Sequence, residues 1–233
     1  MKKKIVLISI AVAIIAMLAV GGSLAYFMDN DEVTNVFTIG SVDIEQNEDF
    51  VQESQLLPVV GIDPADADDN YIKKTVTVEN IGKNGAYVQT YVAVPARLDN
   101  AGVLKLWDDN AATNGWVKLD GDAAMAGVQP MATATFDNML YNVYLYRYSS
   151  ILAKDTETAA CLEYVYITPE TDLNVYTDAN GDKTAYFEID GTEITEFDAT
   201  GKLNVYVATQ AVQDRGFADA DEALDTAFTV IPW

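Results

Sequence analysis

Histidine is absent from the 233 residues, and cysteine occurs only once, as Cys161. Without histidine the chain cannot build a Ser–His–Asp triad, a Cys–His dyad or an HExxH zinc site, because each of these needs an imidazole. A single cysteine cannot form an internal disulfide bond. We therefore expect no catalytic activity, and we expect packing rather than cross-links to stabilise the fold.

Basic residues are also few, with 14 Lys and Arg against 36 Asp and Glu, which gives a net charge of −22. Three of the bases are Lys2, Lys3 and Lys4, whereas the first acid is Asp29. The 208 residues after Ala25 therefore carry all 36 acids and 11 of the 14 bases, a net charge of −25. This charge repels phosphates and anionic lipid headgroups, so we expect no nucleic-acid partner.

The first 25 residues have the layout of a secretory signal peptide. A basic segment, Lys2–Lys4, precedes the apolar run Ile5–Val20, and the small residues Ser23 and Ala25 fit the −3 and −1 positions of a cleavage site. A helix over the apolar run rises about 24 Å, which is short of a hydrocarbon core of roughly 30 Å. We predict that a signal peptidase cleaves after Ala25, that Tyr26 becomes the first residue, and that the secreted chain keeps no stable membrane insertion.

Beyond residue 35 the chain alternates apolar and polar residues in short runs, a pattern typical of half-buried strands. Asn80–Gly85 is predicted to be a turn that joins two such runs into a hairpin, and residues 46–70 are predicted to be a loop. Residues 97–137 are less regular. Many short strands with this spacing favour an all-β antiparallel sandwich. The predicted strands are 36–45, 71–79, 87–94, 141–148, 161–168, 172–177, 184–190 and 203–212.

One helix is predicted near the end of the chain. Asp219 and Glu222 have the spacing of a capping box at its start. No Pro-rich or Ser/Gly-rich linker follows residue 35, so residues 36–233 are expected to form one domain. Apolar residues recur at helical spacing at positions 220, 223, 224, 227 and 228.

Two patterns offer a binding function. The aromatic run 141–148 places Tyr144, Tyr146 and Tyr148 on one face, where they form either a sugar-stacking platform or part of the core. Residues 178–182 resemble the first half of a calcium loop, with Asp178, Asn180 and Asp182 as the candidate ligands and calcium as the candidate cofactor. The calcium pattern departs from an EF-hand because Ile189 occupies position 12. A hairpin with Asn180 and Gly181 at its tip explains the same residues.

The N-terminal region resembles the TasA/camelysin family of exported Gram-positive proteins. Gly21-Gly-Ser-Leu-Ala-Tyr-Phe-Met-Asp29 followed by Asn35-Val-Phe-Thr-Ile-Gly40-Ser-Val-Asp-Ile44 is similar to that family's pattern, Gly-Gly-Thr-Leu-Ala-Tyr-Phe-Thr-Asp and then Asn-x-Phe-Thr-x-Gly-x-Val. Two later stretches, Val76–Gly82 and Ala208–Gln213, are similar to the family as well. The resemblance implies a jelly-roll-like sandwich that is processed by a SipW-type signal peptidase and secreted into the biofilm matrix or onto the cell surface.

The resemblance also implies assembly into fibres. In the TasA type, an N-terminal segment of one subunit completes a sheet in its neighbour by strand addition. The matching segment runs from Tyr26 to Glu45, with residues 26–35 as the candidate donor strand. In the alternative, residues 36–45 form a strand of their own domain and residues 26–35 are a loose tail. The candidate contact residues are Tyr26, Phe27, Val33, Phe37 and Ile39.

Camelysin-type members have been described as metallopeptidases, so the resemblance raises that activity. Without histidine, a zinc site would need carboxylates and Cys161 alone, which is an improbable catalytic set. The sequence therefore predicts a secreted, acidic, self-assembling subunit of matrix or cell-surface fibres, with a second copy as its partner. The alternative is a monomeric extracellular module that binds a glycan or calcium.

Overall fold

The computed structural model describes residues 42–50, 56–60, 70–107, 114–121, 129–177, 179–181, 183–194 and 204–233. The predicted signal peptide, its cleavage site and most of the predicted donor segment lie outside these ranges. No helix within the described ranges is long and apolar enough to span a bilayer.

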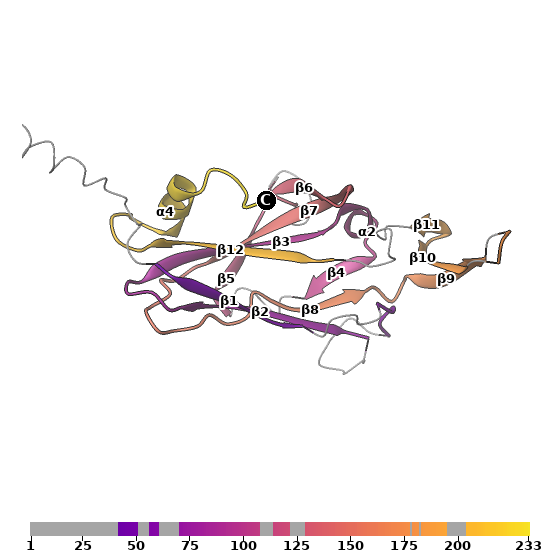
Figure 1. The fold of residues 1–233 in the computed structure, drawn as a ribbon, viewed down its shortest axis with the longest axis horizontal. Helices are drawn as coiled ribbons and strands as arrows, with labels where there is room; N and C mark the ends of the chain where they lie inside the picture. Colours follow the sequence, from indigo (N-terminus) through magenta and orange to yellow (C-terminus); the bar gives the residue numbers. More distant parts are fainter. Residues whose placement is uncertain are drawn as a thin grey trace, which may run out of the picture. The chain divides into compact units, whose positions relative to one another are not determined.

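Two antiparallel sheets face each other across a shared core (Figure 1). Sheet A has the strand order β1-β2-β8-β4, and sheet B has the order β12-β3-β7-β5, with β6 also pairing with β7. The strands of sheet A are β1 (Ile44–Phe50), β2 (Ile72–Asn80), β8 (Leu162–Ile167) and β4 (Leu104–Trp107). The strands of sheet B are β12 (Tyr206–Gln213), β3 (Ala86–Pro95), β7 (Met139–Tyr148), β5 (Trp116–Leu119) and β6 (Ala132–Phe136).

The chain passes repeatedly from one sheet to the other. Strand β2 lies in sheet A, β3 in B, β4 in A, β5 and β7 in B, β8 in A and β12 in B. This interleaving of two antiparallel sheets is jelly-roll-like. The predicted fold class, an all-β sandwich with one short C-terminal helix, is confirmed.

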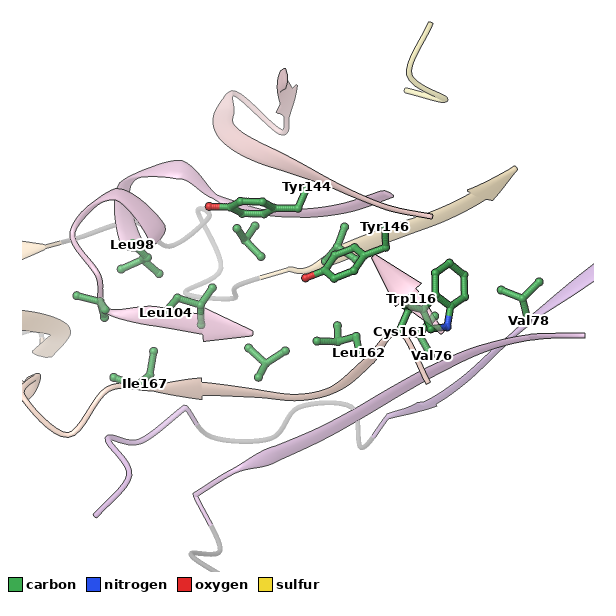
Figure 2. Packing of buried hydrophobic residues seen from close by; sticks show 14 of the residues in the cluster. Val76, Val78, Leu98, Leu104, Trp116, Tyr144, Tyr146, Cys161, Leu162 and Ile167 are labelled. Carbon is green, nitrogen blue, oxygen red and sulfur yellow. The ribbon is translucent and has the colours of Figure 1, made fainter. Parts of the chain in front are cut away.

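The core between the sheets is built from the alternating residues of the long strands. Val76 and Val78 of β2 are fully buried, and so are Val88 and Val92 of β3. Figure 2 shows Tyr144 and Tyr146 of β7 lying over apolar side chains of β4 and β8. Burying each such aliphatic side chain stabilises the folded state by about 1.5–3 kcal/mol. This alternation therefore largely determines which face of each strand turns inward.

The predicted hairpin between 71–79 and 87–94 is wrong, because β2 and β3 belong to different sheets. The residue at the bend, Asn80, is fully buried. Its Nδ2 donates to Asn84 O at 2.8 Å and to Leu152 O at 2.9 Å, and its Oδ1 accepts from Gly82 N at 3.0 Å. These bonds hold residues 81–85 as a connection from sheet A to sheet B. The turn residues alone do not distinguish such a connection from a hairpin loop.

Strand β1 corrects the expectation that residues 46–70 form a loop. Residues 44–50 pair with β2 from Ile44↔Asn80 to Phe50↔Lys74. The polar composition of these residues favoured a loop. In the structure, cross-strand ion pairs stabilise the strand, and Lys74 Nζ lies 2.6 Å from Glu48 Oε2. The predicted strand 36–45 enters the described ranges only at residue 42, and only residues 44 and 45 belong to β1.

A smaller third sheet follows β8 and confirms the predicted turn at Asn180 and Gly181. It has the order β11-β10-β9, from β9 (Asp172–Thr177), β10 (Lys183–Ile189) and β11 (Thr192–Ile194). Gly181 has φ of +89°, a backbone conformation that glycine adopts without strain. Phe187 and Ile194 are buried in the main core and anchor this sheet to the sandwich.

The predicted C-terminal helix is confirmed as α4 (Ala220–Ala227). Asp219 Oδ1 accepts from Glu222 N at 2.9 Å, and Glu222 Oε2 accepts from Ala218 N at 2.7 Å. These bonds satisfy backbone donors at the helix start. Leu224 is buried against the outer face of β3 and β12. The sequence did not predict the five-residue helix α2 (Ala96–Asn100) or the short strands β4, β5, β6 and β11.

Candidate functional site: the open edges of the sheets

The sequence-predicted site residues lie largely outside the described ranges. These ranges exclude the cleavage-site residues Ala25 and Tyr26, and of the candidate calcium ligands they include only Asn180, in the exposed β9–β10 turn. The assignments of cleavage, calcium ligation and donor contact therefore stay predictions. The structure does describe the edges of the sheets, where an added strand would pair. The remaining residues outside the described ranges are Phe27, Val33, Phe37, Ile39, Asp178 and Asp182.

Most edges carry features that discourage pairing with another chain. Strand β1 has the acids Glu45, Glu48 and Asp49, and β4 and β5 have only four residues each. Strand β5 also points Lys118 toward the core side, since Lys118 is in register with Tyr146. The Lys118 Nζ lies 4.0 Å from the Tyr144 ring centroid, where the π face stabilises the ammonium group.

Strand β12 differs from these edges in both length and charge, whereas β6 is also uncharged but has only five residues. Its eight residues, Tyr206–Gln213, include no charged residue, no glycine and no proline. Among the described strands, β12 pairs only with β3. Its described contact with β1 is a side-chain hydrogen bond in which Thr209 Oγ1 donates to Gln46 Oε1 at 2.7 Å. An uncharged edge strand of this length is the type of edge to which an extended peptide can add.

Side chains hold β12 firmly against β3. Gln89 Nε2 donates to Gln210 Oε1 at 2.9 Å, and the hydroxyl oxygens of Thr90 and Thr209 lie 2.9 Å apart. These bonds sit in the middle of the register, where Thr209 pairs with Thr90 and Gln210 with Gln89. These bonds fix the register of β12 on β3.

Helix α4 covers part of the outer face of sheet B and leaves the edge of β12 to other contacts. Arg147 of β7 joins the helix to the sheet, because its Nη1 donates to Asp221 Oδ1 at 2.6 Å and its Nη2 donates to Asp225. The same guanidinium donates through Nε to Gln89 Oε1 at 3.3 Å. A chain of polar contacts thus links α4, β7, β3 and β12.

The aromatic run 141–148 supports the core rather than a sugar-binding platform. Tyr146 is fully buried and Tyr144 nearly so in the core between the sheets, while Tyr141 is fully buried on the opposite face. The cluster around Tyr141 includes Phe136 and Tyr206. A sugar needs an accessible ring face for stacking, and neither Tyr141 nor Tyr146 offers one.

Burial raises the pKa of three tyrosines, Tyr91, Tyr144 and Tyr166. For Tyr144 a second cause is the hydrogen bond that its hydroxyl donates to Asp99 Oδ2 at 2.6 Å. The protonated phenol is therefore favoured in the folded state relative to the unfolded chain, where the ordinary pKa is 10.0.

We predict that the contribution of these tyrosines to the free energy of unfolding is constant well below pH 10 and falls as the pH rises above about 10, because the unfolded chain then releases protons that the folded chain retains. Tyr144→Phe should lower the free energy of unfolding by about 0.5–1.5 kcal/mol at pH 7. It should also make the alkaline decline shallower. Urea denaturation of both proteins over this pH range measures the difference, and equal slopes above pH 10 would contradict the assignment to Tyr144.

Residues 1–88 match the family model of the camelysin metallo-endopeptidase. This match confirms the resemblance drawn from residues 21–44 and 76–82, and it ends within β3. No curated protein matches the chain.

The matched family's description implies a metal ion, and the described residues do not fit one. The chain has no histidine, and Cys161 is fully buried in the apolar core. No three acidic or cysteine side chains within the described ranges are grouped as metal ligands would be. Catalytic zinc sites use imidazole and carboxylate ligands around an open position, and these residues provide no such set. We therefore derive no hydrolytic step for this chain.

Proposed function

We propose that this chain, whose first 88 residues match the camelysin family model, is a secreted structural subunit that assembles with copies of itself into matrix or cell-surface fibres. The observation that carries the proposal is the uncharged edge strand β12 in an otherwise strongly acidic chain. We assign it no catalytic step, and we place it outside the cell of a Gram-positive-type bacterium.

The proposed donor is the N-terminal segment of a neighbouring subunit. Residues 33–42 contain no charged residue, although the chain as a whole carries 36 acids. Eight residues of β12 span about 27 Å, and a donor stretch of similar length matches this span. Residues 33–35 of the candidate donor strand 26–35 belong to this uncharged stretch, and pairing them and residues 36–41 with β12 desolvates no charge.

The donor segment also has a consistent face. Val33, Phe37 and Ile39 occupy odd positions, so they point to one side wherever the segment is extended, and Phe27 falls on the same side beyond Asp29 and Asp31. Main-chain hydrogen bonds to the open edge would supply affinity, and these four side chains would supply specificity by packing against the acceptor. Tyr26 falls on the other face and is the weakest of the predicted contacts.

A charge placed on the edge of β12 tests the proposal. Ala208 is half-buried on the outer face, opposite Tyr91 of β3, so a lysine there does not enter the core between the two sheets. We expect Ala208→Lys to weaken polymerisation by at least about tenfold, because an added strand would have to pack beside an ammonium group. Negative-stain microscopy and sedimentation of the purified protein provide the measurement. Circular dichroism of the variant checks that its fold is kept.

The matched control is Thr133→Lys, which makes the same charge change at an exposed position of another edge strand, β6. This variant should polymerise like the parent. Fibres of unchanged repeat from Ala208→Lys would show that β12 is not the acceptor. A parent protein that stays monomeric at every salt concentration and pH would favour the alternative, a monomeric binding module.

A further inference from the structure

Strand β9 is a second open edge, at the outer side of the three-stranded sheet (Figure 1). Within the described ranges it pairs only with β10. Leu173 is 39% exposed and Val175 is 59% exposed, although both are aliphatic and both lie in this strand. An edge strand that exposes aliphatic side chains invites pairing with another strand.

These two residues lie on the face of the sheet that continues from the core. Leu173 is in register with Phe187, and Val175 lies two positions along β9, so these three side chains share one face. Phe187 is buried in the core at 1% exposure. The apolar face is therefore covered where β10 meets the sandwich and exposed farther along β9.

We infer that β9 pairs with β9 of a second copy, antiparallel and around a two-fold axis through Asn174, so that two three-stranded sheets become one sheet of six strands. In this register Leu173 of each copy lies opposite Val175 of the other, and Asn174 lies opposite its own counterpart. Two aliphatic cross-strand pairs replace four exposed side chains, and such pairs stabilise a sheet.

The neighbouring registers are less favourable. Centring the axis on Val175 would set Leu173 opposite Thr177, so that only one aliphatic pair would form. Centring it on Leu173 would leave only residues 172–174 of β9 paired. In the register centred on Asn174, residues 172–176 all pair, and Asp172 lies opposite position 176, which is uncharged. A register centred between two residues would set the apolar face of one copy against the polar face of the other.

The contact uses neither β12 nor residues 26–41, so it does not depend on the proposed fibre. It joins two copies that each carry a net charge of −22, and association is therefore expected to strengthen as salt screens their repulsion.

Cysteine cross-linking tests the contact and its register together. Opposed residues of an antiparallel pair have Cα atoms about 4.5–5.5 Å apart, whereas diagonal positions are about 7–8 Å apart. A disulfide bond needs Cα atoms within about 7 Å. Asn174→Cys should therefore give a covalent dimer on mild oxidation, and Val175→Cys should give far less. The native Cys161 is fully buried, so the parent protein should give none.

A charge substitution gives the second measurement. Val175→Lys should weaken the association of the purified full chain by at least about tenfold in sedimentation equilibrium, because each copy loses an aliphatic pair and gains a buried ammonium group. Val117→Lys is the matched control, since Val117 is 46% exposed on another edge strand, β5, and its association should equal that of the parent.

The outcomes separate this contact from the proposed fibre. Covalent dimers from Asn174→Cys that persist in the Ala208→Lys background support the β9 contact, whatever happens to polymerisation. The inference is overturned if Asn174→Cys forms no dimer, if Val175→Cys forms as much dimer as Asn174→Cys, or if Val175→Lys associates as strongly as Val117→Lys.

Discussion

Deleting Tyr26–Asn35 is expected to leave a soluble, folded protein that no longer polymerises. The described core begins beyond this segment, at Val42 and Ile44, so the monomer loses little by the deletion. The assembly loses the inter-subunit main-chain hydrogen bonds of the donor strand and two of its candidate contact side chains, Phe27 and Val33. Circular dichroism measures the fold and electron microscopy measures the fibres.

The single substitution Phe27→Asp should weaken assembly nearly as much. One aromatic side chain that fills a neighbour's pocket stabilises the contact by about 1.5–3 kcal/mol. Its loss should therefore raise the dissociation constant of each contact roughly tenfold to hundredfold. Met28→Asp is the matched control, because it adds the same charge at the next position, which points to the opposite side of an extended strand.

Two results would reject this scheme. If the deleted protein still forms fibres of the same repeat, lateral contacts rather than a donor strand hold the polymer. If the deleted protein unfolds, the segment belongs to the core of its own domain and is not a donor.

The second large effect is expected for Trp116→Ala, which should lower the free energy of unfolding by about 3–5 kcal/mol. Trp116 is fully buried between the sheets, its ring centroid lies 5.3 Å from that of Tyr148, and its Nε1 donates to Ala159 O at 2.8 Å. The substitution leaves a cavity and an unpaired carbonyl group. Urea denaturation measures this loss directly, provided that the dependence of the free energy of unfolding on urea concentration has the same slope in both proteins.

The neighbouring residue offers the control for this measurement. Val117 is 46% exposed, so Val117→Ala should change the free energy of unfolding by less than about 0.5 kcal/mol. A loss below about 1 kcal/mol for Trp116→Ala would show that Trp116 does not hold the two sheets together.

The fold was predictable where the alternation of residues was long and clear. β2, β7 and β9 were recognised because several apolar residues in each recur at every second position. β1 was missed because its polar side chains are stabilised by pairs such as Lys74 with Glu48, which join residues 26 positions apart. The hairpin was predicted wrongly for the same reason, because a contact between distant residues, Asn80 and Leu152, directs the chain from β2 into the other sheet.

The candidate site was only half visible in the sequence. Residues 203–212 were predicted as a strand, but that this strand lies at an edge follows from the topology of sheet B. The absence of charge from Tyr206–Gln213 was the available signal, because edge strands without charges are exceptional in soluble proteins. The candidate donor contacts, Phe27 and Val33 among them, lie outside the described residues, so the pairing itself stays a prediction.

The position of β12 has a consequence for how the chain reaches its native state. Strand β3, whose ten residues are all buried, pairs on one side with a strand from the far end of the chain, and the bond between Gln89 and Gln210 joins residues 121 positions apart. Such long-range pairing makes folding slow. A chain that emerges N-terminus first must therefore keep the edge of β3 unsatisfied until nearly all of its residues are available, and during that interval β3 is the strand most exposed to aggregation.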